Sequence, residues 1–124
     1  MIYKTLKTFN DLEQISADEL KLVPTKGSGN VQNDGDSKGN NYGKETYGLA
    51  LLECKFTEKE KKTVSFSKKD WEKTKASAYR YGRLPVMCTG DIAGEIFVHL
   101  SLDIFKSIYL DHITLINKYQ EEEE

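Results

Sequence analysis

The tripeptide Glu53-Cys54-Lys55 lies near the end of an apolar segment, Thr46 to Phe56, which reads TYGLALLECKF. Residues two apart in a β-strand point to the same side, so Glu53 and Lys55 are expected to project together, with Cys54 on the opposite face. A carboxylate and an ammonium at the end of a buried strand are costly unless they have partners or do chemistry. Together they can hold a hard cation and polarise a phosphate. The alternative is a surface ion pair, which contributes about 0 to 1 kcal/mol.

A second carboxylate, Asp36, follows Gly35 in a segment, residues 25–46, that is rich in Gly, Asn, Ser and Asp. If Asp36 lies on a strand antiparallel to that of Glu53, the two carboxylates meet across the pair. Two carboxylates with waters and a phosphate oxygen make an octahedral Mg²⁺ site. Such a metal lowers the pKa of a bound water, and Lys55 would position that water or stabilise the transition state. Asp36 is alternatively a turn residue, and Asp34 is a nearby competitor.

The charge distribution is more informative than the net charge of −2. The four glutamates at residues 121–124 form an acidic run that composition predicts to be disordered. Without them the balance is −2 + 4 = +2. Basic residues crowd the central stretch, residues 55–83, where Lys59 and Lys69 are candidates for contact with DNA phosphates. The alternative is a solvated helix face.

The elements that would position these groups alternate between helix and strand. A helix is predicted over residues 11–22, with Asn10 as its cap and Glu13 at the capping-box position. A second helix is predicted to begin after Ser67 and to end at Gly82. Strands are predicted at residues 46–56, 63–66, 84–88 and 95–100, the last with Ile96, Val98 and Leu100 pointing inward.

The end of the chain is less clearly patterned. Ser101 is predicted to cap a last helix through Tyr109, and the pattern beyond Asp111 fits strand or helix. The order as a whole favours an α/β fold, a mixed central β-sheet flanked by helices.

The 124 residues suit one domain, residues 1–120, followed by the acidic tail 121–124. No run of about 18 apolar residues could cross a bilayer, and the N-terminus lacks the pattern of a secretory signal, so a cytoplasmic protein is predicted. Cys54 and Cys88 both lie in apolar runs and are expected to be small buried side chains, not a disulfide or a zinc site.

Several short motifs occur together in a suggestive order. They are Gly27-Ser28-Gly29-Asn30, Gly35-Asp36, Leu52-Glu53-Cys54-Lys55, Trp71-Glu72-Lys73 with Ala78, and Gly82-Arg83-Leu84-Pro85-Val86. In this order the chain resembles the PD-(D/E)XK nucleases, and among them the small phage and archaeal endonucleases related to Holliday-junction resolvases. The resemblance covers roughly residues 11–86 and implies a restriction-endonuclease-like core.

The resemblance also implies roles for individual residues. Asp36 and Glu53 would hold Mg²⁺ or Mn²⁺, and Lys55 would be the catalytic lysine. Glu13 would match an acid of the first helix that can join the metal, although a capping role explains it equally well. Lys73 would match a polar residue that faces the site, or else be a solvated lysine. Two loop residues, Ser28 and Asn30, would approach the DNA backbone, or else be plain turn residues.

The function predicted from these residues is metal-dependent hydrolysis of DNA phosphodiester bonds, and the resemblance implies branched DNA, such as a four-way junction, as substrate. Paired cuts in a junction would suit a homodimer. One alternative is a DNA-binding or inhibitory module that keeps the fold without the activity. Another is a small structural protein in which Glu53 and Lys55 form a surface ion pair.

Overall fold

The computed structural model describes residues 1–24, 41–43 and 50–123. Within them lie three helices and five strands, in the order α1 (Phe9–Leu20), β1 (Leu22–Pro24), β2 (Asn41–Gly43), β3 (Ala50–Thr57), α2 (Lys68–Arg80), β4 (Leu84–Asp91), β5 (Ile96–His99) and α3 (Leu102–Glu123). The predicted class, a mixed sheet flanked by helices, is confirmed.

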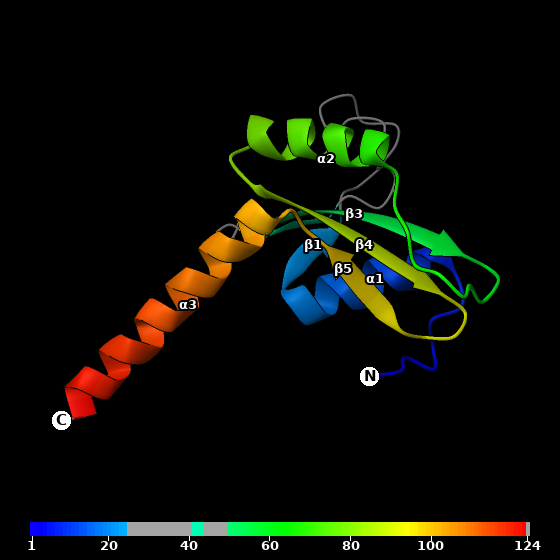
Figure 1. The fold of residues 1–124 in the computed structure, drawn as a ribbon. Helices are drawn as coiled ribbons and strands as arrows, with labels where there is room; N and C mark the ends of the chain where they lie inside the picture. Colours follow the sequence, from blue (N-terminus) through cyan, green and yellow to red (C-terminus); the bar gives the residue numbers. More distant parts are fainter. Residues whose placement is uncertain (25–40, 44–49, 124) are drawn as a thin grey trace.

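The strands form one sheet in the order β1-β2-β3-β4-β5 (Figure 1). Three of the neighbouring pairs are antiparallel, β1 with β2, β2 with β3, and β4 with β5, whereas β3 and β4 are parallel. A parallel pair needs a crossover connection, and α2 supplies it. The long register of β3 with β4, from Ala50↔Leu84 to Thr57↔Asp91, makes these two strands the centre of the sheet.

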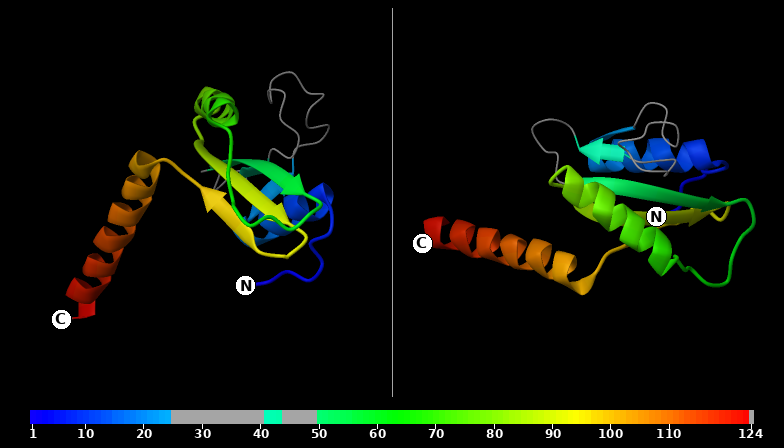
Figure 2. Two further views of the ribbon diagram at one scale, coloured as in Figure 1. Left: turned by 45° about the vertical axis from the view of Figure 1, so that its right-hand side comes forward. Right: turned by 90° about the horizontal axis from the view of Figure 1, so that it is seen from above.

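Helices α1 and α2 cover opposite faces of the sheet, as the views in Figures 1 and 2 agree. Because side chains alternate along β3, Leu52 and Cys54 face the α1 side and join a core with Leu6 and Leu12. Leu51, Glu53 and Lys55 project to the other face, under α2. The prediction that this strand is buried on both faces is confirmed, since residues 51–54 are all buried.

Helix α1 begins two residues earlier than predicted, and its cap is different. Thr8, not Asn10, is the N-cap, and its hydroxyl accepts a hydrogen bond from the Asp11 backbone N–H at 3.1 Å. The Asp11 carboxylate in turn accepts one from the Thr8 N–H at 2.9 Å, which completes a capping box. The box therefore belongs to Asp11, and capping does not explain Glu13.

Helix α2 has the predicted cap, because the Ser67 hydroxyl accepts hydrogen bonds from the Lys69 and Asp70 backbone N–H groups. The strand predicted at residues 63–66 is wrong. That segment does not pair with the sheet, where both edges of β3 are already occupied by β2 and β4. Instead Phe66 lies over the sheet and contacts the rings of Trp71 and His99.

The last helix differs most from its prediction. Ser101 does cap it, at 3.4 Å from the Ile104 backbone N–H, but α3 continues far beyond Tyr109 and includes Glu121–Glu123, which composition predicted to be disordered. Val98 on β5, predicted to point into the core, is exposed, because β5 is an edge strand and Val98 lines an open groove. In the parts of the chain that the structure describes, no helix is long and apolar enough to span a bilayer.

Candidate active site

Strand β3 brings Glu53 and Lys55 to the same face, as their spacing predicts. The Glu53 side chain is 2% exposed, and its Oε1 lies 3.5 Å from the Lys55 Nζ, which is half-exposed at 49%. The pair therefore joins a carboxylate within the protein to an ammonium at its surface. An acidic side chain is seldom fully buried unless it is paired, so this geometry is distinct from a surface ion pair.

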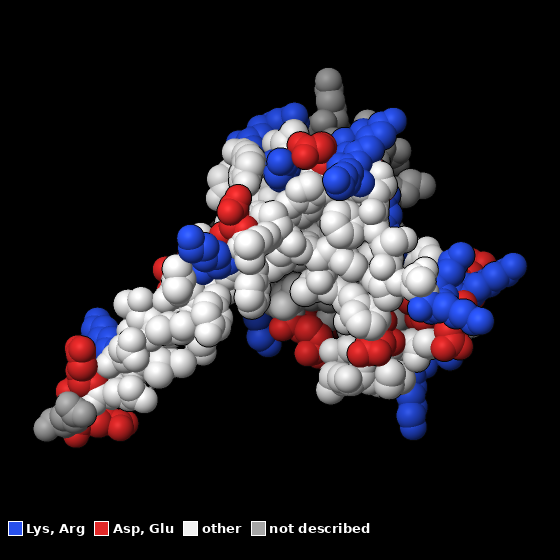
Figure 3. All heavy atoms as spheres, in the orientation of Figure 1, with Lys and Arg blue, Asp and Glu red and all other residues white. Residues whose placement is uncertain are grey.

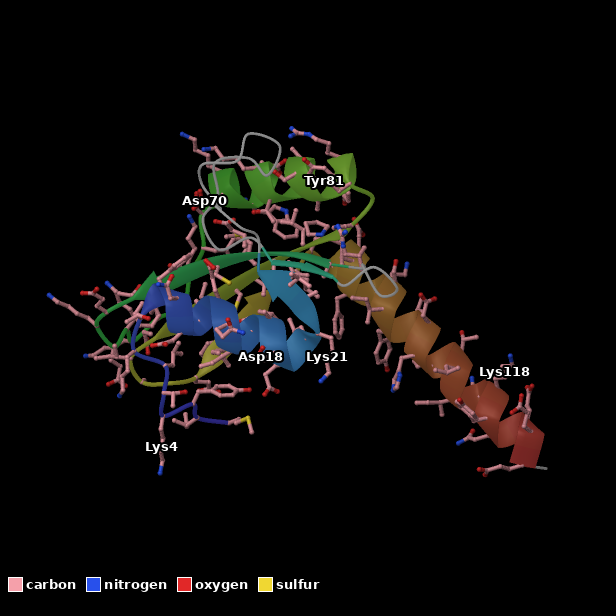
Figure 4. The ribbon with its side chains drawn as sticks, turned by 180° about the vertical axis from the view of Figure 1, so that it is seen from behind. Lys4, Asp18, Lys21, Asp70, Tyr81 and Lys118 are labelled. Carbon is pink, nitrogen blue, oxygen red and sulfur yellow. The ribbon has the colours of Figure 1, made fainter. Side chains whose placement is uncertain are left out.

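Asp70 holds the other side of the Lys55 ammonium. Its Oδ2 lies 3.8 Å from Nζ, so Lys55 connects β3 to the first turn of α2. Figure 4 shows Asp70 at the end of α2 that lies over the C-terminal part of β3. The sequence showed Asp70 only as a helix-start residue, and nothing in its local pattern indicates a contact with a strand residue fifteen positions earlier.

Glu13 approaches the same part of β3 from the α1 side. It is half-buried, and this burial raises the pKa of its carboxyl. The pKa of the Cys54 thiol is raised chiefly by its hydrogen bond with Cys88 and by burial, and further by the negative charges of Glu13 and Glu53. Glu13 lies on the helix that covers the opposite face of the sheet from Glu53, so a shared metal site for these two carboxylates stays a prediction.

A groove of about 200 Å³ begins at Lys55 and runs along the same face of the sheet. Side-chain hydroxyls line it together with basic groups at Lys55 and Lys61 and acidic groups at Asp91 and Glu95. The hydroxyls come from Thr57, Thr63, Ser65 and Thr89. The Thr89 hydroxyl is held 2.9 Å from the His99 Nε2, and burial lowers the pKa of that imidazole. The hydroxyl and ammonium groups suit the oxygens of a phosphate backbone, whereas the Asp91 and Glu95 carboxylates repel them.

The other predicted site residues are more dispersed. Lys73 is exposed on α2, one turn beyond Asp70; Lys69 is exposed in the first turn of α2, and Lys59 in the loop after β3. Asp36, Ser28, Asn30 and Asp34 lie outside the described residues, so the predicted pairing of Asp36 with Glu53 stays a prediction. Among residues 1–24, 41–43 and 50–123, no three His, Cys, Asp or Glu side chains are close enough together to hold a metal ion.

The donor types are nonetheless those of a hard-cation site. Carboxylate oxygens are the usual protein ligands of Mg²⁺ and Mn²⁺, and Glu53 supplies them beside Lys55. The chain matches no protein-family model, and no curated protein or solved structure matches it. Function is therefore inferred from the geometry around Glu53 and Lys55.

Proposed function

We propose that this protein is a metal-dependent endonuclease that hydrolyses DNA phosphodiester bonds, with Glu53 and Lys55 at its reaction centre. The proposed substrate is branched DNA, and the proposed location is the cytoplasm, where DNA is accessible to it. The observation that supports this most is the buried Glu53 carboxylate with the Lys55 ammonium 3.5 Å away on the same strand face. Burial of an ionised carboxylate costs several kcal/mol, which is unnecessary for a structural ion pair.

Glu53 and Lys55 have different proposed roles because one side chain is buried and the other is half-exposed. Glu53 is fixed within the sheet and offers carboxylate oxygens in a constant position, with Glu13 and Asp36 as the proposed further ligands. When bound there, a divalent cation supplies Lewis-acid stabilisation of the charge on the phosphate. Lys55 reaches the surface, so its ammonium can contact a phosphate oxygen of the substrate. Its two carboxylate neighbours, Glu53 and Asp70, hold that ammonium near the position where negative charge develops.

The order of elements supports a restriction-endonuclease-like core. A helix bearing Glu13 is followed by antiparallel strands, then by the strand bearing Glu53 and Lys55, then by a helix and a parallel strand. This is the order that the PD-(D/E)XK resemblance implies for the nuclease motifs. The agreement covers the part of the chain from α1 to β4.

A basic surface adjoins the proposed centre. Lys and Arg side chains gather over α2 and at the loop after β3 (Figure 3). The exposed residues there include Lys59, Lys61, Lys68, Lys69 and Lys73. Such a surface favours phosphate contacts that are independent of sequence, with an affinity that falls as salt rises. It suits an enzyme that recognises DNA by its shape.

The proposal is tested by cleavage assays with four-way, flap and linear duplex DNA in Mg²⁺, Mn²⁺ or EDTA. We expect metal-dependent cutting that is lost in Glu53→Gln and Lys55→Met, each by about 100-fold or more, because each removes a charged group that acts directly on the transition state. Glu60→Gln and Lys62→Met are the matched controls, because both residues are exposed in the loop after β3. They should cut like the wild type.

Two other results would contradict the proposal. Tight DNA binding without cutting in any metal would indicate a binding or inhibitory module. Absence of DNA affinity at low salt would indicate a structural protein. Circular dichroism of each variant shows whether a loss of cutting reflects a loss of fold.

A further inference from the structure

Helix α3 projects from the body of the molecule with most of its apolar side chains in solvent. Figures 1 and 2 show it leaving the end of β5 and pointing away from the sheet and from the other two helices. Between Leu102 and Glu123 only Ile104, in the first turn, is buried. Over most of its 22 residues α3 packs against none of the other residues that the structure describes, so those residues do little to stabilise it.

The exposed apolar residues of α3 follow a helical stripe. They recur at spacings of three and four residues, which places them on one face with the exposed His112 among them. The stripe consists of Phe105, Ile108, Tyr109, Leu115, Ile116 and Tyr119. In Figure 3 the length of α3 is largely uncharged, and acidic side chains gather at its tip. A helix with a charged end and a long apolar stripe is typical of a helix–helix interface.

An apolar groove lies beside the base of α3. It has a volume of about 520 Å³ and is lined by Leu20, Leu22, Ala50, Val86, Val98 and Leu100, with Lys21 at its edge. Figure 4 shows Lys21 at the end of α1 that faces α3. The groove reaches Leu100, two residues before α3 begins, and we call the groove and the stripe together the α3 surface.

We propose that the α3 surface binds a second copy of this chain, through an antiparallel pair of α3 helices centred on His112. In this register Phe105 lies opposite the partner's Tyr119. Ile108 likewise lies opposite the partner's Ile116, so the stripe covers itself under a two-fold axis. This inference is independent of the nuclease proposal, because none of these residues belongs to the proposed active site.

Charge disfavours the parallel orientation of such a pair. A parallel pair would set the two Glu121–Glu123 runs side by side, and like charges would repel. The antiparallel pair separates the two acidic runs and places each beside the start of the partner's α3, where the positive end of the helix dipole attracts it and Asp103 repels it. Lys21 at the edge of the groove adds a positive charge there.

The available area is also adequate. An aromatic side chain buries about 150–250 Å² when fully packed, so the half-exposed rings of Phe105, Tyr109 and Tyr119 offer roughly 300 Å² per copy. The aliphatic side chains and the groove add to this. The total approaches the roughly 800 Å² that each partner contributes to a stable interface.

The test is the mass of the full chain in solution, measured by sedimentation equilibrium over a range of concentrations. We expect wild type to be a dimer and Ile116→Glu to raise its dissociation constant by about 30-fold or more, since a charge is introduced twice at the centre of the interface. Leu110→Glu is the matched control, because Leu110 is equally exposed but lies off the stripe. It should remain a dimer.

Monomeric wild type at about 100 μM would overturn the proposal, because interfaces of this size form well below that concentration. An Ile116→Glu variant that dimerises as well as wild type would also overturn it. The residue is exposed and far from the core, so the variant is expected to fold.

Disulfide trapping tests the orientation. Ile108→Cys and Ile116→Cys proteins are mixed and oxidised mildly, with wild type as the control for the buried Cys54 and Cys88. The antiparallel pair predicts the mixed cross-link between positions 108 and 116. Cross-links that join only like positions would indicate a parallel pair and would contradict the proposal.

Discussion

The centre of β3 and the length of α3 depart from the usual partition of residues in opposite ways. At β3 an acidic side chain, Glu53, is buried among apolar neighbours, whereas along α3 large apolar side chains are exposed. Both arrangements cost free energy in an isolated monomer. The difference suggests what each region requires, because a fixed buried charge suits chemistry on a charged substrate and an exposed apolar stripe suits a protein partner.

The largest expected effect comes from removing the buried carboxylate of Glu53 on β3. In Glu53→Leu we expect DNA cleavage to fall by about 100- to 1,000-fold or more. The free energy of unfolding should stay the same or rise, by up to about 2 kcal/mol, because an apolar side chain replaces a buried charge. Lys55 is half-exposed and so is not left as a buried charge. Cleavage rates and urea unfolding of the same preparation check both parts.

A loss of stability together with a loss of cleavage in Glu53→Leu would mean that the carboxylate is structural. In that case the contrast between the two regions would disappear, since neither would be strained for a function.

The next effect compares apolar side chains in the two regions. Leu52 is fully buried beneath α1, so Leu52→Ala should lower the free energy of unfolding by about 2–5 kcal/mol. Ile116→Ala should change the stability of the monomer by less than about 0.5 kcal/mol, because little is packed against it. Urea unfolding at a concentration where wild type is monomeric measures both. Equal effects would show that α3 packs on its own domain.

Hydrogen exchange extends the same comparison to the backbone. Amides of β3 and β4 should be protected to the same extent at all protein concentrations, because their bonds lie within one chain. Amides of α3 should become more protected as concentration rises, since pairing with a second copy stabilises the helix. Mass spectrometry at several concentrations measures this. Protection of α3 that is independent of concentration would contradict the pairing.

The smallest effect concerns Glu13. Burial raises the pKa of its carboxyl above the ordinary value of 4.5, so the folded protein favours the neutral form. Its stabilising contribution is present below pH 4.5 and is lost as the pH rises through the folded pKa. Glu13→Gln should therefore match wild type below that pH and be slightly more stable at pH 7, by about 0.5 kcal/mol or less, since solvent screens a half-exposed group.

Thermal unfolding at pH 4 and pH 7 checks this prediction. If Glu13 also holds the cation, cleavage by Glu13→Gln should fall although stability does not. A variant that is less stable than wild type at pH 7 would show instead that the Glu13 charge stabilises the fold.

Local sequence patterns predicted many of the helices and strands but not the contacts between them. The apolar run around Leu52 and the cap at Ser67 are local signals, and both led to the correct elements. The contact between Lys55 and Asp70 depends on how α2 crosses the sheet, so spacing alone does not reveal it. The cap of α1 was misassigned because Thr8–Asp11 and Asn10–Glu13 have the same spacing, and only geometry separates them.

Prediction was weakest at the end of the chain. An acidic composition indicates disorder, but Glu121–Glu123 extend a helix that already begins at Leu102, and extending a helix costs far less than starting one. The alternation of β5 predicted that Val98 is covered. Val98 is exposed because β5 is an edge strand, which the pattern of β5 alone does not reveal.

Titration calorimetry of Mn²⁺ binding to the protein without DNA is the most direct test that Glu53 serves a metal-dependent reaction. We expect wild type to bind about one Mn²⁺ per chain and Glu53→Gln to bind at least about 10-fold more weakly, because the amide lacks the charge of the carboxylate. Glu60→Gln, changed in the exposed loop after β3, should bind like wild type. Equal Mn²⁺ affinity in wild type and Glu53→Gln, or no binding by wild type at millimolar Mn²⁺, would contradict the role assigned to Glu53.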